Sequence, residues 1–208
     1  MKASIVSASV LLALAACEEM EPEDAAEEPQ RELSADSANE AETPIFHAAV
    51  GAPIDAGTGT RWIENHRRVA GSEVVSYTIR VETLRRILGS PGCVGISLQY
   101  GVDDSGELQI VPVGVDGDGR PIADTVVPVE ARRFTGRYTG TVKSHFFGRN
   151  TFIRLLDERH SEAMRATPAL DDDRAPQLLL SDAAEKEPRV YEDRSFPCSS
   201  ACPSLPEP

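Results

Sequence analysis

The chain has 208 residues, and 34 Asp and Glu against 21 Lys and Arg give it a formal charge of −13. The length fits one or two domains, and an apolar fraction of 40% supports a modest core, which argues against a wholly disordered chain. Phosphate binding needs net positive charge, so no nucleic-acid partner is predicted. No apolar run is long enough for an ordinary transmembrane helix.

The first residues have the pattern of an export signal. Lys2 supplies a positive start, residues 5–14 form a short apolar stretch, and small residues follow. Leu14-Ala15-Ala16-Cys17 then resembles the lipobox of bacterial lipoproteins, in which a signal peptidase cuts before the cysteine and the thiol takes up diacylglycerol. The resemblance implies a signal peptide over residues 1–16, a lipidated Cys17, and attachment to a lipid bilayer through acyl chains such as palmitate.

The residue after Cys17 bears on the destination of such a lipoprotein. In the enterobacterial sorting rule, Asp at this position retains a lipoprotein in the inner membrane, and here the residue is Glu18. The resemblance therefore implies a lipid-anchored protein of the cell envelope, placed at the outer membrane.

A strongly acidic segment follows the lipobox, and we interpret residues 17–43 as the lipidated cysteine with a disordered tether. Glu18 to Thr43 holds eleven acidic residues and one basic residue, a net charge of −10. Such a segment buries too little apolar surface to offset its ordering entropy. From residue 44 onward there are 23 acidic and 19 basic residues, a net charge of only −4, so the overall acidity belongs mainly to the tether.

The folded body is predicted over residues 44–190, and its first elements are helical. Thr58 to Val69 places Trp62, Ile63, His66 and Val69 on one face at helical spacing, and Gly71 is a suitable stop. Val81 to Leu88 predicts a second short helix, because Leu84, Ile87 and Leu88 share a face and Gly89 and Pro91 follow.

A β-hairpin comes next. Cys93 to Val102 alternates between apolar and other residues, Asp103 to Gly106 has turn composition, and Leu108 to Val115 is the return strand. Pro112 predicts that the return strand lies at a sheet edge or carries a bulge, and Thr125 to Val129 is a candidate third strand. Together these elements predict an α+β fold of short helices packed on a small antiparallel sheet.

The sequence of the second half of the body is similar to that of the first half when the residue numbers are shifted by a constant amount. Ile87-Leu88 falls on Leu155-Leu156, Ser76 on Ser144, and Asp103-Asp104 on Asp171-Asp172, and we call this shift the repeat offset. The match predicts two diverged helix-helix-hairpin repeats, over residues 58–125 and 128–190. In the second repeat, residues 161–170 lose the alternation and Pro168 replaces Tyr100. The alternative is a single α+β domain with coincidental similarity.

Three segments of the body and tail carry a second resemblance. They are Ser144 to Glu158 (SHFFGRNTFIRLLDE), Ile87 to Gly106 (ILGSPGCVGISLQYGVDDSG) and Pro197 to Pro203 (PCSSACP). They resemble small uncharacterised exported bacterial proteins that have Phe-Phe-Gly, Gly-Cys-x-Gly-Ile and C-terminal Pro-Cys motifs. The resemblance implies a shared fold and no activity.

Residues 191–208 are predicted to be an otherwise structureless tail with a cysteine pair. An exported protein can form disulfides, and with Cys17 lipidated three thiols are left. A local bridge between Cys198 and Cys202 is the favoured pairing. The alternative joins Cys93 to one of these two, which would fix the tail to the hairpin.

One segment of the body is basic. Residues 131–156 contain no acidic residue, and their basic residues are Arg132, Arg133, Arg137, Lys143, Arg149 and Arg154. With aromatic residues interleaved, this pattern is typical of a surface that docks an anionic polymer or lipid head groups. The alternative is a basic face balanced by acidic loops elsewhere.

No motif of a catalytic, cofactor or metal site stands out. The run Asp116 to Gly119 begins like a calcium loop, but Arg120 and Pro121 stand where a ligand and a glycine are needed. We therefore expect a non-catalytic binding or structural role in the envelope, with an envelope polymer or protein as partner. The alternative is an envelope hydrolase that acts on a cell-wall or exogenous polymer, so whether the protein is an enzyme stays open.

Overall fold

The protein is described from a computed structural model, over residues 45–71, 75–122, 134–157, 161–193 and 195–199. All of these lie in one compact unit, Glu42–Pro208. Cys17 and the predicted tether lie outside the described residues, as does the candidate strand Thr125 to Val129.

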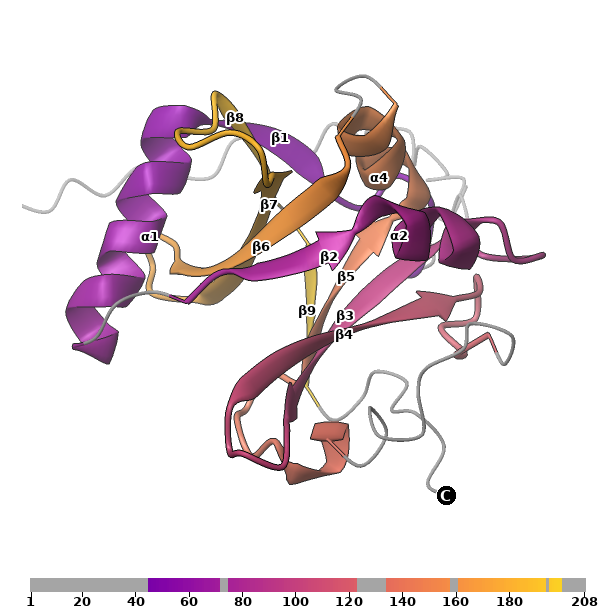
Figure 1. Cartoon of the computed structure of the whole chain (residues 1–208), viewed down its shortest axis with the longest axis horizontal. Helices are drawn as coiled ribbons and strands as arrows, with labels where there is room; N and C mark the ends of the chain where they lie inside the picture. Colours follow the sequence, from indigo (N-terminus) through magenta and orange to yellow (C-terminus); the bar gives the residue numbers. More distant parts are fainter. Residues whose placement is uncertain (1–44, 72–74, 123–133, 158–160, 194, 200–208) are drawn as a thin grey trace, which may run out of the picture. The chain divides into compact units, whose positions relative to one another are not determined.

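The strands form two antiparallel sheets. The five-stranded sheet has the order β1-β8-β7-β6-β2 and the four-stranded sheet the order β4-β3-β5-β9. The bounds of the strands are β1 Ala52–Asp55, β2 Tyr77–Arg80, β3 Gly95–Val102, β4 Leu108–Val115, β5 Ser144–Gly148, β6 Ala163–Leu170, β7 Pro176–Asp182, β8 Val190–Asp193 and β9 Phe196–Cys198. The helices are α1 Ala56–Ala70, α2 Val81–Leu88 and α4 Arg149–Leu156, and residues 134–137 form a further short helix (Figure 1). The predicted α+β class is confirmed, with the strands divided between two sheets.

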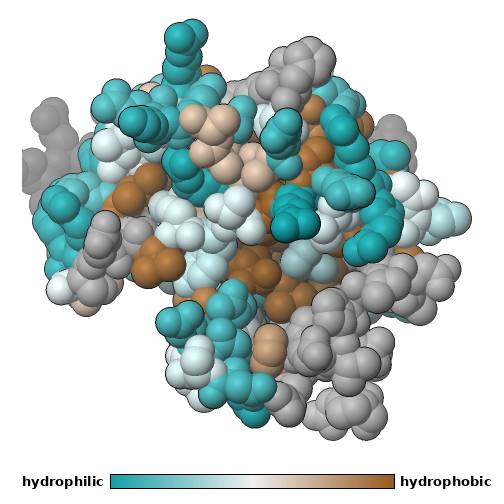
Figure 2. Space-filling view, in the orientation of Figure 1, coloured by the Kyte–Doolittle hydropathy of each residue, from teal (hydrophilic) through white to brown (hydrophobic). Residues whose placement is uncertain are grey.

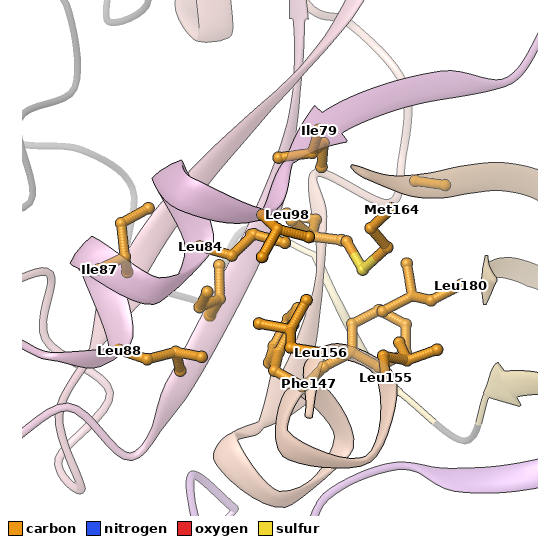
Figure 3. Close-up of a cluster of buried hydrophobic side chains, with 14 of the residues drawn as sticks. Ile79, Leu84, Ile87, Leu88, Leu98, Phe147, Leu155, Leu156, Met164 and Leu180 are labelled. Atoms are coloured by element: carbon orange, nitrogen blue, oxygen red, sulfur yellow. The ribbon is translucent and has the colours of Figure 1, made fainter. Parts of the chain in front are cut away.

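The main hydrophobic core lies where α2, α4 and one face of each sheet meet. Alternate residues of each strand enter it, because successive side chains of a strand point to opposite faces. Figure 3 shows side chains from both helices and both sheets converging there. The least exposed members are Leu84, Ile96, Leu98, Phe147, Phe152, Leu155, Met164, Ala166, Leu178 and Leu180. Burial of each large side chain stabilises the fold by about 1.5–3 kcal/mol.

Helix α1 covers the opposite face of the five-stranded sheet. Asp55 caps its N-terminus, accepting hydrogen bonds from the Thr58 backbone N–H at 2.9 Å and the Thr58 hydroxyl at 2.7 Å, and Gly71 ends it in the left-handed conformation. Trp62 and Ile63 pack on the cluster formed by Ala169, Leu179 and Tyr191. The prediction that Val69 shares the buried face is wrong, since it is 66% exposed. The last turn of the helix, residues 67–70, is exposed.

The two halves of the body have the same element order at a constant offset. When the chain is shifted by the repeat offset, strand β2, helix α2 and strands β3 and β4 fall on β5, α4, β6 and β7. The pairing registers agree as well, because Tyr77 of β2 lies opposite Ala166 and His145 of β5 lies opposite Leu98. These matches support the predicted repeat. It stays a proposal, because the counterpart of α1 would fall on residues 124–138, most of which lie outside the described residues.

The turns of the two hairpins also agree in atomic detail. The Asp103 carboxylate accepts from the backbone N–H groups of Ser105 and Glu107 and from the side chain of Gln109, at 2.9 Å each. Asp171 accepts from the residues that match these at the repeat offset, Asp173, Ala175 and Gln177, at 2.8–3.0 Å. Hydrogen bonds to the Asp103 carboxylate lower its pKa to about 2, and the bond from the Ser105 hydroxyl is the largest cause.

Two sequence expectations need correction. Residues 163–170 form a full strand despite the lost alternation, because β6 pairs with β7 from Met164 to Leu170. Pro168 is tolerated there because the β2 pairing ends at Ala166. The expected structureless tail contains β9, and β8 overlaps its first residues, since both strands pair with distant parts of the chain. The expectation for Pro112 is confirmed, because β4 is an edge strand.

Candidate binding face

Three tyrosines gather where β2 approaches the β3–β4 hairpin. The rings of Tyr100 and Tyr138 are stacked, with centroids 5.1 Å apart and planes at 29°. Burial raises the pKa of all three phenols, and in Tyr100 the neighbouring Tyr138 and Tyr77 raise it further. The three hydroxyls therefore stay protonated at neutral pH and offer neutral hydrogen-bond donors on apolar rings.

Apolar side chains extend this cluster to the surface. Leu108 and Ile110 of β4 are half-buried against the main core, as are Tyr77 and Tyr138. Ile110 lies directly opposite Tyr100 in the hairpin, so the two side chains are on one face. Figure 2 shows hydrophobic surface near the centre of the face on which β2 and β4 lie. We call Tyr77, Tyr100, Leu108, Ile110 and Tyr138 the tyrosine face.

Polar contacts at the rim hold this arrangement in place. The Lys143 ammonium donates to the Tyr138 carbonyl at 2.6 Å and lies 5.5 Å from its ring centroid, which is a cation–π distance. Arg137 pairs with the Asp104 carboxylate at 2.8 Å and donates to the Asp103 carbonyl. These contacts join the segment around Tyr138 to the hairpin turn.

His145 lies beneath the tyrosine face and is completely buried. Its Nδ1 is 2.9 Å from the Ser195 hydroxyl, its ring meets Tyr100 edge-on at 5.8 Å, and Nε2 has no hydrogen-bond partner within the described part of the chain. Burial lowers its pKa to about 3, so the ring is neutral at physiological pH. Since both His145 and Ser195 are buried, this pair is a structural contact between β5 and the residue that precedes β9.

Two open depressions lie beside α2, and neither is lined by a residue of the tyrosine face. One, of 460 Å³, is lined by Val81, Glu82, Arg85, Ser161 and Glu162. The second, of 230 Å³, lies between α2 and α4, where Arg85 approaches the Asp157 carboxylate at 3.6 Å. The described residues contain no group of His, Cys, Asp and Glu side chains that could hold a metal ion. Both depressions mix opposite charges and offer no ordered set of ligands.

Each described basic residue of the predicted anion site is engaged in a contact of its own. Arg132 and Arg133 lie outside the described residues. Arg137 and Lys143 hold the rim of the tyrosine face, Arg149 donates to the Leu88 carbonyl at 2.8 Å, and Arg154 pairs with the buried Glu192 at 2.7 Å. Each described basic residue thus makes a contact within the protein, and these contacts add no support for an anionic partner.

Of the four cysteines, Cys93 and Cys198 lie in the described part of the chain. Cys93 is a buried free thiol whose sulfur donates to the Gly95 carbonyl at 3.2 Å, and burial raises its pKa. The alternative in which Cys93 holds the tail is therefore wrong. Cys198 is buried in β9 and disulfide-bonded, but Cys202 lies outside the described residues, so the Cys198–Cys202 pairing stays a prediction.

The sequence pattern indicates this face only in part. It places Tyr100 in a predicted strand and Tyr138 in the basic segment, but it gives no role to Tyr77. The repeat offset is a signal that relates Tyr77 to this face, since Tyr77 then falls on His145, whose ring contacts Tyr100.

Comparisons with protein-family models, curated proteins and solved structures found no match to this chain. No helix in the described ranges is long and apolar enough to cross a membrane. A function for the chain is therefore inferred from its own sequence and geometry.

Proposed function

We propose that the protein is a lipid-anchored, non-catalytic binding protein of the bacterial cell envelope, and that it holds a protein partner on the tyrosine face. The observation that carries the binding role is the group of aromatic and aliphatic side chains between two sheet edges, β2 and β4, in which the half-buried Tyr77, Leu108, Ile110 and Tyr138 surround the buried Tyr100. Tyr is enriched at protein interfaces because its ring buries apolar area while its hydroxyl keeps a hydrogen-bond partner.

The anchoring part of the proposal rests on the sequence Leu14-Ala15-Ala16-Cys17. A thiol at this position can take up diacylglycerol, and the acidic segment up to Thr43 is a spacer between lipid and body. The alternative of an envelope hydrolase gains no specific observation from the described ranges, because the buried His145–Ser195 pair is closed to substrate.

Two measurements test the two parts separately. Cells that express the Cys17→Ser chain should accumulate the unprocessed form and fail to incorporate labelled palmitate; normal processing and labelling of this variant would contradict the anchoring.

For the binding part, a photo-crosslinking side chain is placed at Ile110 on the tyrosine face, with a matched control at Arg68 on the exposed side of α1. A discrete adduct from position 110 that is missing from position 68 is the expected result. Equal patterns from the two positions would reject the face.

A further inference from the structure

In the described part of the chain, no strand pairs with the outer edge of β2, whereas the equivalent edge in the other half of the body is occupied. Strand β9 pairs with β5 from Ser144 to Phe146. The residues that match these at the repeat offset are Ser76 to Thr78, and no described strand pairs with β2 on the side away from β6. We propose that this edge binds an extended peptide segment of a partner protein as an additional antiparallel strand.

The backbone groups at this edge point in the required direction. Val81 donates its N–H to the Glu162 carbonyl at 3.1 Å, so the odd-numbered residues of this segment direct their backbone groups toward β6. Alternate residues of a strand direct them to opposite sides, and the backbone N–H and carbonyl of Thr78 therefore point away from the sheet. A strand edge of this kind is a template for pairing with another chain.

Strand β9 indicates the register and the residue types that a peptide bound to β2 would have. In its register Phe196 lies opposite Phe146 and Pro197 lies opposite His145. A peptide that binds β2 in the equivalent register has one residue opposite Thr78, and these two residues exchange backbone hydrogen bonds. The next peptide residue lies opposite Tyr77, on the side of the tyrosine face, where an apolar residue such as proline fits. The occupant is therefore a short, extended and partly apolar segment.

The positive charge of Arg80 at the edge of β2 favours an acidic residue in the bound peptide. Thr78 and Arg80 are both exposed, and Arg80 forms no ion pair within the described residues. In an antiparallel pair, the peptide residue opposite Arg80 comes two positions before the one opposite Thr78. An acidic residue at that peptide position would face the guanidinium, so we expect a partner segment with an acid on the N-terminal side of its apolar residue.

The probe is a synthetic peptide based on this chain's own residues 193–199, with Arg194→Glu to supply the acid and Cys198→Ser to remove the thiol. Binding to the purified full chain is measured by fluorescence anisotropy. Because β2 is short, spanning only Tyr77–Arg80, a Kd on the order of 100 μM is expected. The original Arg residue in the peptide should weaken binding several-fold, since it faces Arg80 with like charge.

Backbone pairing is tested on the peptide, so that protein folding does not interfere. N-methylation of the Phe amide removes the hydrogen bond to the Thr78 carbonyl and should weaken binding about tenfold. N-methylation of the preceding Ser amide is the matched control, because that amide faces away from β2 and binding should be kept. On the protein, Thr78→Pro removes the outward N–H and should weaken binding, whereas Thr78→Val should not.

Absence of binding, or equal loss with both methylated peptides, overturns the proposal. A dimer in analytical ultracentrifugation that Thr78→Pro abolishes would show that the edge pairs with a second copy instead, which also overturns it. The inference rests on the proposed binding role, but its failure is distinguishable. Crosslinking from Ile110 tests the tyrosine face whether or not a strand adds to β2.

Discussion

The buried imidazole of His145 predicts a specific loss of stability in mild acid. Its pKa is about 3 in the folded protein because burial penalises the charged ring, whereas an unfolded histidine has a pKa of about 6.5. Between these two values the unfolded chain binds a proton that the folded protein does not. The stability that the neutral ring permits is therefore fully present above pH 6.5 and falls as the pH is lowered through this window.

The size of the effect follows from the width of the window. Each pH unit between the two pKa values changes the free energy of unfolding by about 1.4 kcal/mol. Lowering the pH from 8 to 5 covers about 1.5 units of the window and should cost about 2 kcal/mol from His145 alone. For a chain of this length such a loss lowers Tm by roughly 4–8 °C.

The assay is urea denaturation at pH 8, 6.5 and 5, comparing the wild type with His145→Phe, which keeps an aromatic ring beside Tyr100 but cannot take up a proton. Between pH 8 and pH 5, the free energy of unfolding of the variant should fall by about 2 kcal/mol less than that of the wild type. Ser195→Ala is the matched control, since it removes the 2.9 Å contact but leaves the imidazole, so its pH dependence should stay like that of the wild type. Parallel pH curves for the wild type and His145→Phe would refute the reasoning.

Four further substitutions test packing and buried or turn hydrogen bonds, each by urea denaturation. Arg154→Met leaves the buried Glu192 carboxylate without its two hydrogen bonds and should cost about 3–5 kcal/mol, whereas a loss below about 1 kcal/mol would mean that water reaches Glu192. Gly59→Ala drives a methyl group against the ring of Tyr191 and should cost about 1–3 kcal/mol; an unchanged midpoint would show that α1 can shift. Asp103→Ala and Asp171→Ala remove equivalent hydrogen bonds in the two hairpin turns and should lower the midpoint by similar amounts; strongly unequal shifts would count against the repeat.

The elements that the sequence predicts well are those set by local patterns. Helix α2 has the predicted bounds, Val81–Leu88, because its apolar residues repeat at helical spacing and Gly89 follows directly. The β3–β4 hairpin also lies where alternation and the Asp103 turn place it. In both cases the residues that determine the structure are close neighbours in the chain.

The elements that the sequence missed depend on distant partners. Strand β1 has four residues, too few for a periodic pattern, and it forms because Ala52 lies opposite Asp193. Pro197 argues against a strand at β9, yet the edge of β5 pairs with it. Short strands of this kind take their conformation from a partner that is remote in the chain, which a local pattern does not contain.

The predicted basic site shows the same dependence on distant partners. Along the chain, the stretch from Arg132 to Arg154 has the pattern of one basic surface. In the structure, Arg137 meets Asp104 and Arg154 meets Glu192, and each acid comes from a different strand or turn. A run of like charge therefore says little about a surface until its tertiary partners are known.

The open edge of β2 leads to a last prediction, because Arg80 has two possible roles there. A charged residue on an edge strand can protect it from unwanted pairing, in which case Arg80→Ala should make the chain self-associate and bind the peptides more tightly whatever their charge. If Arg80 instead recognises an acidic partner segment, Arg80→Ala should weaken the Glu-containing probe several-fold and abolish its advantage over the Arg-containing one. Anisotropy with both peptides and ultracentrifugation of the variant separate the two roles. Strand β9 covers the edge of β5, and no described strand covers the matching edge of β2, so protection and recognition are the two ways in which Arg80 can act there.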